Sequence, residues 1–339
     1  MKRGLVMLCL AVLATTNVVA QSDVEKLKSA FKSEMLNLTG YAHVIYSANE
    51  HPALGLGNND VNSSFDLARA VLTAIGTFGD KKQFKYSLQY NFVSSSSGLM
   101  DLYGEWDPVQ AANFRFGQFK IPFTMEMPMS ATRVETIYST RPIAAMAGGR
   151  DIGVQLSGKA FQGEGFSKLV YAAGIFNGTG KNAKDNNNHK DVIGTVYVQP
   201  IKGLRVNGSI YSGKTYGTVN GVLPLENHVH NLWSVGLDYN ITHFSGRSEY
   251  LSANDGGIHK EGYYGLAVYK IVPNKWEILG KYDVYNRNKD ISDSKITDIT
   301  AGVNYYFAYL TRVQLNYIAT NNQKEGKNNA VAVCLQLYF

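Results

Sequence analysis

The chain has 339 residues, and its 22 Tyr, 15 Phe and 33 Gly against only 8 Pro are typical of a protein with many strands. No run of about 18 apolar residues occurs after the N-terminal segment, which excludes transmembrane helices there. The formal net charge of +6 is too small to indicate a nucleic-acid partner.

The N-terminus is typical of an export signal. Lys2 and Arg3 precede an apolar stretch over 5–13, which is followed by small residues that suit cleavage. We therefore expect residues 1–20 to be a signal peptide. Its removal leaves 31 basic and 27 acidic residues and one cysteine, Cys334. Neither an internal disulfide nor a cysteine-based metal site is then possible, and no cofactor is expected.

Residues 21–35 carry Val24, Leu27, Phe31 and Met35 at roughly helical spacing, with charged residues between them. This spacing predicts a short amphipathic lead-in helix. A plug or a partner-binding segment is the alternative interpretation.

From residue 36 onward, apolar and polar residues alternate in successive segments, the pattern of strands with one apolar face. In "FKYSLQYNF", for example, Phe84, Leu88 and Phe92 share one face, and Lys85 and Gln89 share the other. Most segments are near the ~9–11 residues that a tilted strand needs to cross a bilayer. The sixteen predicted strands are 36–48, 64–76, 82–95, 98–106, 112–120, 150–160, 166–176, 190–200, 203–213, 229–240, 243–253, 261–271, 274–286, 296–308, 311–320 and 330–339.

The connections between these segments differ in length. Short links such as "TFGDKK", "PIKG" and "NIT" alternate with longer ones, apart from a short "SSSSG". Short turns on one rim and long loops on the other are typical of outer-membrane barrels. An even number of strands places both chain ends, and thus the 21–35 helix, on the short-turn, periplasmic side. The predicted long loops are 49–63, 121–149, 177–189, 214–228, 254–260, 287–295 and 321–329.

The last segment, "NAVAVCLQLYF", places Val331, Val333, Leu335, Leu337 and Phe339 on one face. A final strand that ends in Phe is similar to the terminal signal of bacterial outer-membrane barrels, which the barrel-assembly machinery reads. Phe339 is therefore the predicted contact with that machinery. An ordinary edge strand is the alternative.

Two folds are compatible with strands of this kind. A soluble sandwich would bury the apolar faces, whereas a barrel in lipid would turn them outward. Strands can cross a bilayer only as a closed barrel, because every backbone polar group must be paired there. The export signal, the two kinds of connection and the terminal Phe favour the barrel. We predict an all-β transmembrane antiparallel β-barrel of about 16 strands over 36–339, wide enough for an aqueous channel, in the outer membrane of a Gram-negative bacterium.

The longest connection, 121–149, is richer in Met, Ala and Pro than the other loops. We expect it to fold inward as a constriction loop. It carries Arg133 and Arg141 and is flanked by Lys120 and Arg150, and such side chains can replace the hydration shell of an anion. Replacing Arg133 or Arg141 by Ala is predicted to weaken an anion preference. Alternatively, these cations pair with carboxylates and only hold the loop in place.

Alternation assigns further charges to the polar, lumen-facing side of the strands. Their modest positive balance predicts weak focusing of anions rather than strict selectivity. The cations are Lys85, Arg115, Lys168, Arg205, Arg247, Lys270, Lys281 and Arg312, and the acids are Asp101, Glu105, Asp151, Asp238, Glu249, Asp283 and Asp298.

No enzymatic motif emerges. There is no His-Glu-x-x-His, and "GTGK" at 178–181 lacks the Gly and Ser/Thr of a phosphate-binding loop. His228 and His230 share a strand face as a possible metal pair, but no third ligand is near in the sequence. They are interpreted as a solvated loop end.

The run "FRFGQFKIPF" at 114–123, followed by "GGRDIGVQLSGK" at 148–159, resembles the phosphate-selective porin O and P family of Gram-negative outer membranes. The resemblance implies an anion-conducting, sixteen-stranded homotrimeric channel with arginines at its narrowest point. Arg133, Arg141 and Arg150 fall in or beside the matching loop, and Arg115 and Lys120 in the matching run. The family's ladder of basic residues is not matched here, because acids interleave.

The expected partners are small anionic or polar solutes and outer-membrane lipid. The sequence predicts a porin for passive diffusion that leans toward anions, with phosphate as a candidate solute. The alternative is a non-conducting structural or adhesive surface barrel whose loops bind a partner.

Overall fold

The computed structural model describes residues 32–33, 35–49, 63–79, 81–94, 97–162, 167–219 and 222–339. The predicted signal peptide and residues 21–31 of the predicted lead-in helix lie outside these ranges. Lys32–Ser33 (β1) is extended and pairs with Leu36 and Asn37. In the described part of the chain, no helix is long and apolar enough to cross a membrane.

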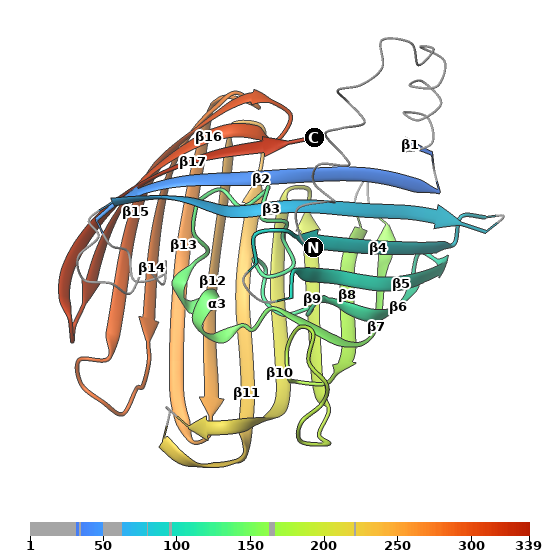
Figure 1. Cartoon of the computed structure of the whole chain (residues 1–339), viewed down its shortest axis with the longest axis horizontal. Coiled ribbons are helices and arrows are strands. Elements are labelled where there is room, and N and C mark those ends of the chain that lie inside the picture. The colour runs from blue at the N-terminus through green and yellow to red at the C-terminus, as the bar shows by residue number, and fades with distance from the viewer. Residues whose placement is uncertain are drawn as a thin grey trace, which may run out of the picture.

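Within the described residues, sixteen antiparallel strands, β2 to β17, form one closed barrel (Figure 1). Each strand pairs with the next one in the sequence, and β17 pairs with β2 to close the ring. At this seam Gly40 and Phe339 exchange two backbone hydrogen bonds, of 2.8 and 3.0 Å. The predicted fold class is therefore confirmed.

The strands have the following bounds: β2 Leu36–Ala48, β3 Ser63–Phe78, β4 Phe84–Asn91, β5 Leu99–Val109, β6 Ala112–Lys120, β7 Arg150–Gln162, β8 Ser167–Phe176, β9 Asp191–Ile201, β10 Leu204–Val219, β11 Val222–Asn240, β12 Phe244–Asp255, β13 Ile258–Val272, β14 Trp276–Asn286, β15 Lys295–Ala308, β16 Thr311–Asn322 and β17 Gly326–Tyr338.

The apolar faces of the strands form the outer surface of the barrel. On β16, Gln314 and Asn316 are at most 2% exposed, whereas Leu315 and Tyr317 between them are 44% and 47% exposed. A soluble protein would show the reverse, because its apolar side chains leave water on folding. This inside-out distribution suits an outer surface covered by hydrocarbon and a polar interior.

Three predicted long loops are wrong. Residues 214–228, 254–260 and 321–329 continue the paired strands, so that β10 and β11, for example, remain hydrogen-bonded as far as Val219 and Val222. The physical reason is that a strand beyond the hydrocarbon faces water on both sides. Its apolar alternation is then lost although its backbone ladder continues.

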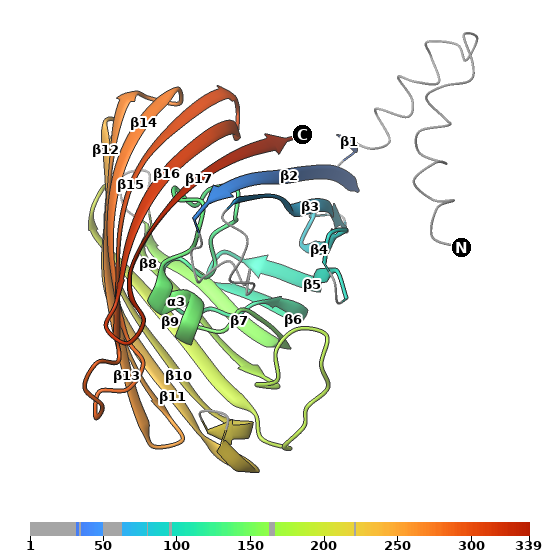
Figure 2. The same ribbon diagram turned by 60° about the vertical axis from the view of Figure 1, so that its left-hand side comes forward.

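Segment 121–149 connects β6 to β7 and includes the short helix α3 (Arg141–Met146). Figure 2 shows α3 within the ring of strands. The buried apolar side chains of segment 121–149, such as Phe123, Ile143 and Met146, belong to one packed cluster with side chains from the surrounding wall. The wall contributes Phe176, Ile193, Tyr211, Leu232, Leu251, Ala253, Tyr264 and Tyr285 to this cluster.

Candidate functional site

Side chains on β14 to β17 hold the backbone of segment 121–149 against the inner wall. Each donor reaches a main-chain carbonyl of residues 132–138, so these contacts do not depend on the segment's own side chains. On that side of the lumen a cavity of only about 280 Å³ remains between the segment and strands β14 to β16. The contacts are Gln336 Nε2 to Thr132 O (3.1 Å), Arg312 Nη2 to Val134 O (2.6 Å), Asn304 Nδ2 and Gln314 Nε2 to Glu135 O (3.0 and 2.9 Å), and Lys281 Nζ to Tyr138 O (3.2 Å).

Carboxylates strengthen this attachment. The two Glu249 carboxylate oxygens on β12 accept the backbone N–H of Met125, both at 3.2 Å. Within the segment, the Glu126 carboxylate accepts the backbone N–H of Thr140 at 2.9 Å. Glu135 pairs with Arg247 of β12, with 2.9 Å between Oε2 and Nη2. Backbone N–H groups and cations thus satisfy these buried acids, as buried charges require.

Arg141, at the start of α3, lines the cavity between the segment and strands β14 to β16, and its charge is paired there. Its guanidinium makes two contacts with the Asp298 carboxylate on β15, of 2.5 and 2.9 Å, and the Arg141 side chain is 11% exposed. Close by, burial raises the pKa of the Tyr138 hydroxyl above its ordinary value, so that Tyr138 stays neutral.

Opposite this anchored side, a cavity of about 700 Å³ lies between segment 121–149 and strands β4 to β9. Pro122 and Pro128 belong to the segment, and the rest of the lining comes from the wall and its turns. The charged lining residues are the cations Lys85, Arg115, Lys120 and Lys159 and the acids Glu105 and Asp107.

Two of these cations are paired across neighbouring strands. Arg115 Nη2 lies 2.5 Å from Glu105 Oε2, and its guanidinium lies over the Tyr103 ring at 4.4 Å from the centroid. Lys85 Nζ lies 2.8 Å from Asp107 Oδ2. Because each of these charges has a partner, they contribute little net field to the cavity.

Lys120, Lys159 and Arg133 differ from them. Among the described residues, no carboxylate lies within ion-pair distance of these three cations. Lys120 Nζ donates to the Met129 carbonyl, and Arg133 Nη2 donates to the Tyr309 hydroxyl at 2.8 Å. Lys159 is exposed on the lumen face of β7. The positive charge of each of these three cations therefore adds to the field around it.

Arg150, at the start of β7, is bound on the inner side of the neighbouring hairpin. Its Nε lies 2.6 Å from Asp101 Oδ1, and its Nη2 lies 3.0 Å from Gln89 Oε1. The five predicted site residues therefore do not form one cluster. Arg115 and Lys120 line the same cavity, whereas Arg133, Arg141 and Arg150 lie at three separate positions.

A second cavity, of about 600 Å³, lies between segment 121–149 and strands β9 to β13. Arg205 Nε lies 2.9 Å from Asp238 Oδ1 at its wall, and Lys202 lies in the turn that borders it. Sequence reasoning missed Lys159 and Lys202 as cavity-lining cations. Lys159 could have been found, because alternation places its side chain on the same lumen-facing side of the strand as Asp151.

The histidine pair has a neighbour that the sequence did not reveal. His228 Nε2 and His230 Nδ1 lie 3.3 and 3.2 Å from Asp255 Oδ1, and Lys260 Nζ lies 2.5 Å from Asp255 Oδ2. Asp255 is the register partner of His230 on the next strand. Within the described ranges, no three His, Cys, Asp or Glu side chains are arranged to hold a metal ion.

A closed barrel with an apolar outside, a polar and charged inside, and a long segment packed against its inner wall defines a channel-forming porin of the Gram-negative outer membrane. The chain belongs to the phosphate-selective porin O and P family, whose model matches residues 54–204 and 202–339. Family and fold are those of channel proteins rather than enzymes.

Solved structures share this fold at low sequence identity. The anion-selective porin from Comamonas acidovorans is 18% identical, with 90% of this chain and 99% of that chain covered at a TM-score of 0.65. Salmonella typhi OmpF in complex with daunomycin is 13% identical, with 90% and 97% covered at 0.68. The trimer form of OmpT from Vibrio cholerae is 14% identical, with 90% and 99% covered at 0.63. No curated protein matches the chain by sequence.

Proposed function

We propose that this porin passes small anions in preference to cations, along a path between segment 121–149 and strands β4 to β9. The observation that carries the proposal is the charge on the cavity of about 700 Å³ there: Lys120 and Lys159 line it without an ion-pair partner among the described residues. Its acids, Glu105 and Asp107, already contact Arg115 and Lys85. A lumen with this balance attracts anions by its field without binding them tightly.

The contacts of segment 121–149 support its role as the constriction. Wall donors hold its backbone at residues 132–138, and its apolar side chains pack on the wall. Because the segment is held at so many points, the width of the channel beside it stays fixed, as a selective pore requires.

We further propose phosphate as a solute, which the family's description supports. The two cations without carboxylate partners suit an oxyanion with more than one charge, because ammonium groups bind phosphate as point charges. Arg133, on the far side of the segment, offers a third such charge.

Ionic selectivity of the purified protein in planar bilayers tests this function. A KCl gradient is expected to give a reversal potential toward that of chloride, and added phosphate is expected to reduce the chloride current in a saturable way. Sulfate serves as the control for a divalent oxyanion. A cation-selective reversal potential would overturn the anion preference. A chloride current that phosphate does not change would overturn the proposal that phosphate is a solute.

We also propose that the protein assembles as a homotrimer, as one of the similar structures is described. Unheated gels and mass measurement in detergent check this directly: a species of three chains that dissociates on heating is expected, and a monomer under mild extraction contradicts it.

Finally, we propose that Phe339 is read by the barrel-assembly machinery. Its side chain is 70% exposed although its backbone is paired with Gly40. Phe339→Ala is expected to slow insertion in cells. Phe307→Ala is the matched control, since Phe307 is a comparably exposed (60%) aromatic on the outer face. Equal insertion rates for the two variants would contradict the assignment.

A further inference from the structure

One part of the inner wall is apolar, although the interior of such a barrel is otherwise polar. Leu266 and Val268 on β13 and Leu279 on β14 pack together as a small cluster, and each is at most 7% exposed. Leu266 and Val268 also line the second cavity, of about 600 Å³, and so do Met125 and Met129 of the segment that crosses the lumen. The wall and the segment therefore both contribute apolar surface to this cavity.

The charged lining of the second cavity has a positive balance. Arg205 is paired with Asp238, with 2.9 Å between Nε and Oδ1, and Arg247 is paired with Glu135, with 2.9 Å between Nη2 and Oε2. Lys202, in the turn between β9 and β10, is exposed and lines the same cavity. In the part of the chain that the structure describes, no carboxylate lies within ion-pair distance of Lys202. One positive charge is therefore left without compensation.

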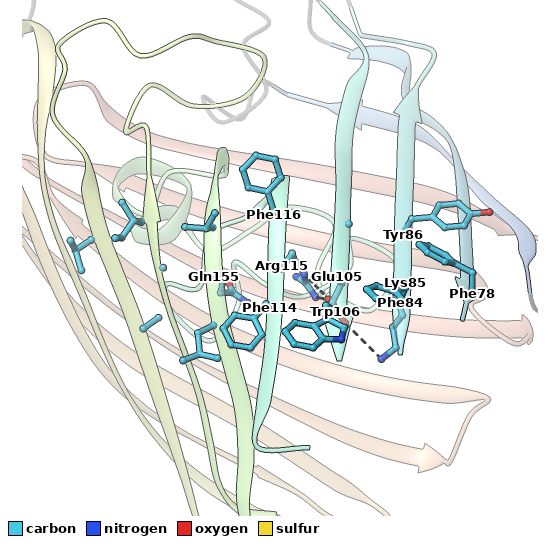
Figure 3. Close-up of a pocket in the computed structure, with 17 residues that line it drawn as sticks. Phe78, Phe84, Lys85, Tyr86, Glu105, Trp106, Phe114, Arg115, Phe116 and Gln155 are labelled. Atoms are coloured by element: carbon cyan, nitrogen blue, oxygen red, sulfur yellow. Dashed lines mark hydrogen bonds and ion pairs between the residues drawn. The ribbon is translucent and has the colours of Figure 1, made fainter. Parts of the chain in front are cut away.

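The cavity beside strands β4 to β9 has a different charge balance. On its wall, Arg115 and Lys85 both reach toward the Glu105 carboxylate (Figure 3). Lys120 and Lys159 add two charges that have no carboxylate partner among the described residues. Two uncompensated charges suit an oxyanion with more than one charge, whereas the single charge of the second cavity, beside apolar surface, suits another kind of anion.

We propose that the second cavity binds a singly charged organic anion with an apolar body, such as an aromatic carboxylate. Its carboxylate lies near Lys202, and its apolar body lies against Leu266 and Met129, where it displaces water from apolar surface. The cavity volume of about 600 Å³ is within the ~300–1,000 Å³ of ligand pockets, which likewise combine apolar surface with a few polar groups. The Tyr197 hydroxyl donates to the Thr124 carbonyl at 3.2 Å between the linings of the two cavities, so this site is beside the proposed path of small anions.

Fluorine NMR of the purified protein in detergent tests this site, with para-fluorobenzoate as the probe. Fluoroacetate carries the charge without the ring. Para-fluorobenzyl alcohol carries the ring without the charge, and it reports partition into detergent. We expect para-fluorobenzoate to bind saturably and at least about tenfold more tightly than fluoroacetate, because each buried group of the size of a CH₂ contributes about fourfold and the ring has several.

Two variants separate the charge from the apolar surface. Lys202→Gln is expected to weaken the binding of para-fluorobenzoate about fivefold. Lys275→Gln is the matched control, because Lys275 is an exposed lysine in the short β13–β14 turn and does not line the cavity. Met129→Gln keeps the side-chain length but removes apolar contact, and a decrease of about fourfold is expected. Met127→Gln is its control, because Met127 lies in the same segment but packs against the other apolar cluster.

Binding of para-fluorobenzoate that is no tighter than that of fluoroacetate, or no tighter than that of the alcohol, would overturn the proposal. So would an equal loss in Lys202→Gln and Lys275→Gln, since the general charge of the rim would then attract the anion. If Lys202→Gln weakens binding but Met129→Gln does not, the anion lies at the turn without entering the cavity, and the proposal is overturned as well. Reversal potentials in a KCl gradient test the anion preference of the channel separately, so that the two proposals can fail independently.

Discussion

Arg141 and Asp298 join segment 121–149 to strand β15 of the wall through two contacts, Nε–Oδ2 at 2.5 Å and Nη2–Oδ1 at 2.9 Å. The Thr320 hydroxyl donates to the same carboxylate at 2.6 Å. The guanidinium charge is therefore neutralised where it lies. Arg141 is placed as an anchor of the segment, and we expect its contribution to anion preference to be smaller than its place in the loop sequence predicted.

Arg141→Ala is expected to lower the stability of the folded barrel more than the double variant Arg141→Ala/Asp298→Ala. The single change leaves the Asp298 carboxylate, 4% exposed, without its cation, and breaking a buried pair on one side costs about 3–5 kcal/mol. The temperature at which the folded band is lost on gels measures this. Equal midpoints for the two variants would contradict the anchoring role.

Lys120→Gln is expected to lower the anion-to-cation permeability ratio. A unit charge at 4 Å contributes about 1 kcal/mol even in water, so a decrease of up to about fivefold is expected. The matched control is Arg115→Gln/Glu105→Gln, which removes both charges of the pair on the same cavity wall. Reversal potentials in a KCl gradient distinguish them. A larger shift in the control would show that paired charges carry the selectivity.

Much of the fold was predictable because lipid imposes a simple pattern. Within the bilayer one face of each strand must be apolar, and alternation located β6 at its observed bounds, 112–120. Above the bilayer that constraint ends, so the extension of β10 and β11 left no apolar signal. A bulge near Arg69 was also foreseeable from the broken alternation there, and the register shifts between His43 and Val44 opposite Arg69.

The site was less predictable than the strands. The Arg115–Glu105 pair follows from the hairpin register of β5 and β6, and could be inferred once the turn is placed. The Arg141–Asp298 pair joins residues 157 positions apart. It depends on the path of segment 121–149 across the lumen, which no local pattern encodes.

Gly117→Ala is expected to impair assembly of the barrel. Gly117 has φ +133°, and an added Cβ would lie 2.3 Å from the Leu102 carbonyl oxygen and 2.7 Å from Tyr103 Cα. Backbone atoms cannot move aside cheaply, and this region of φ is itself unfavourable for alanine. Gly208→Ala, with open space and ordinary φ, is the control. The folded fraction after refolding into detergent is measured; equal fractions would contradict the steric argument.

Cys334 reports whether segment 121–149 stays attached. Its side chain is 1% exposed on the inner face of β17, two residues before Gln336, which donates to the Thr132 carbonyl. In the wild type, a cationic methanethiosulfonate reagent added to folded protein is expected to label Cys334 slowly. Gln336→Leu keeps the side-chain size but leaves a buried carbonyl without its donor, which costs about 1–3 kcal/mol.

Local opening should then become about fivefold to a hundredfold more frequent, since each 1.4 kcal/mol is a factor of ten, and labelling should accelerate accordingly. Gln323→Leu is the matched control, because Gln323 lies in the β16–β17 turn and accepts the Lys295 N–H outside the lumen. Mass spectrometry of timed samples gives both rates. If Gln336→Leu and Gln323→Leu label at the wild-type rate, the Gln336–Thr132 contact does not hold the segment, and the remaining wall donors are sufficient to fix the width of the pore.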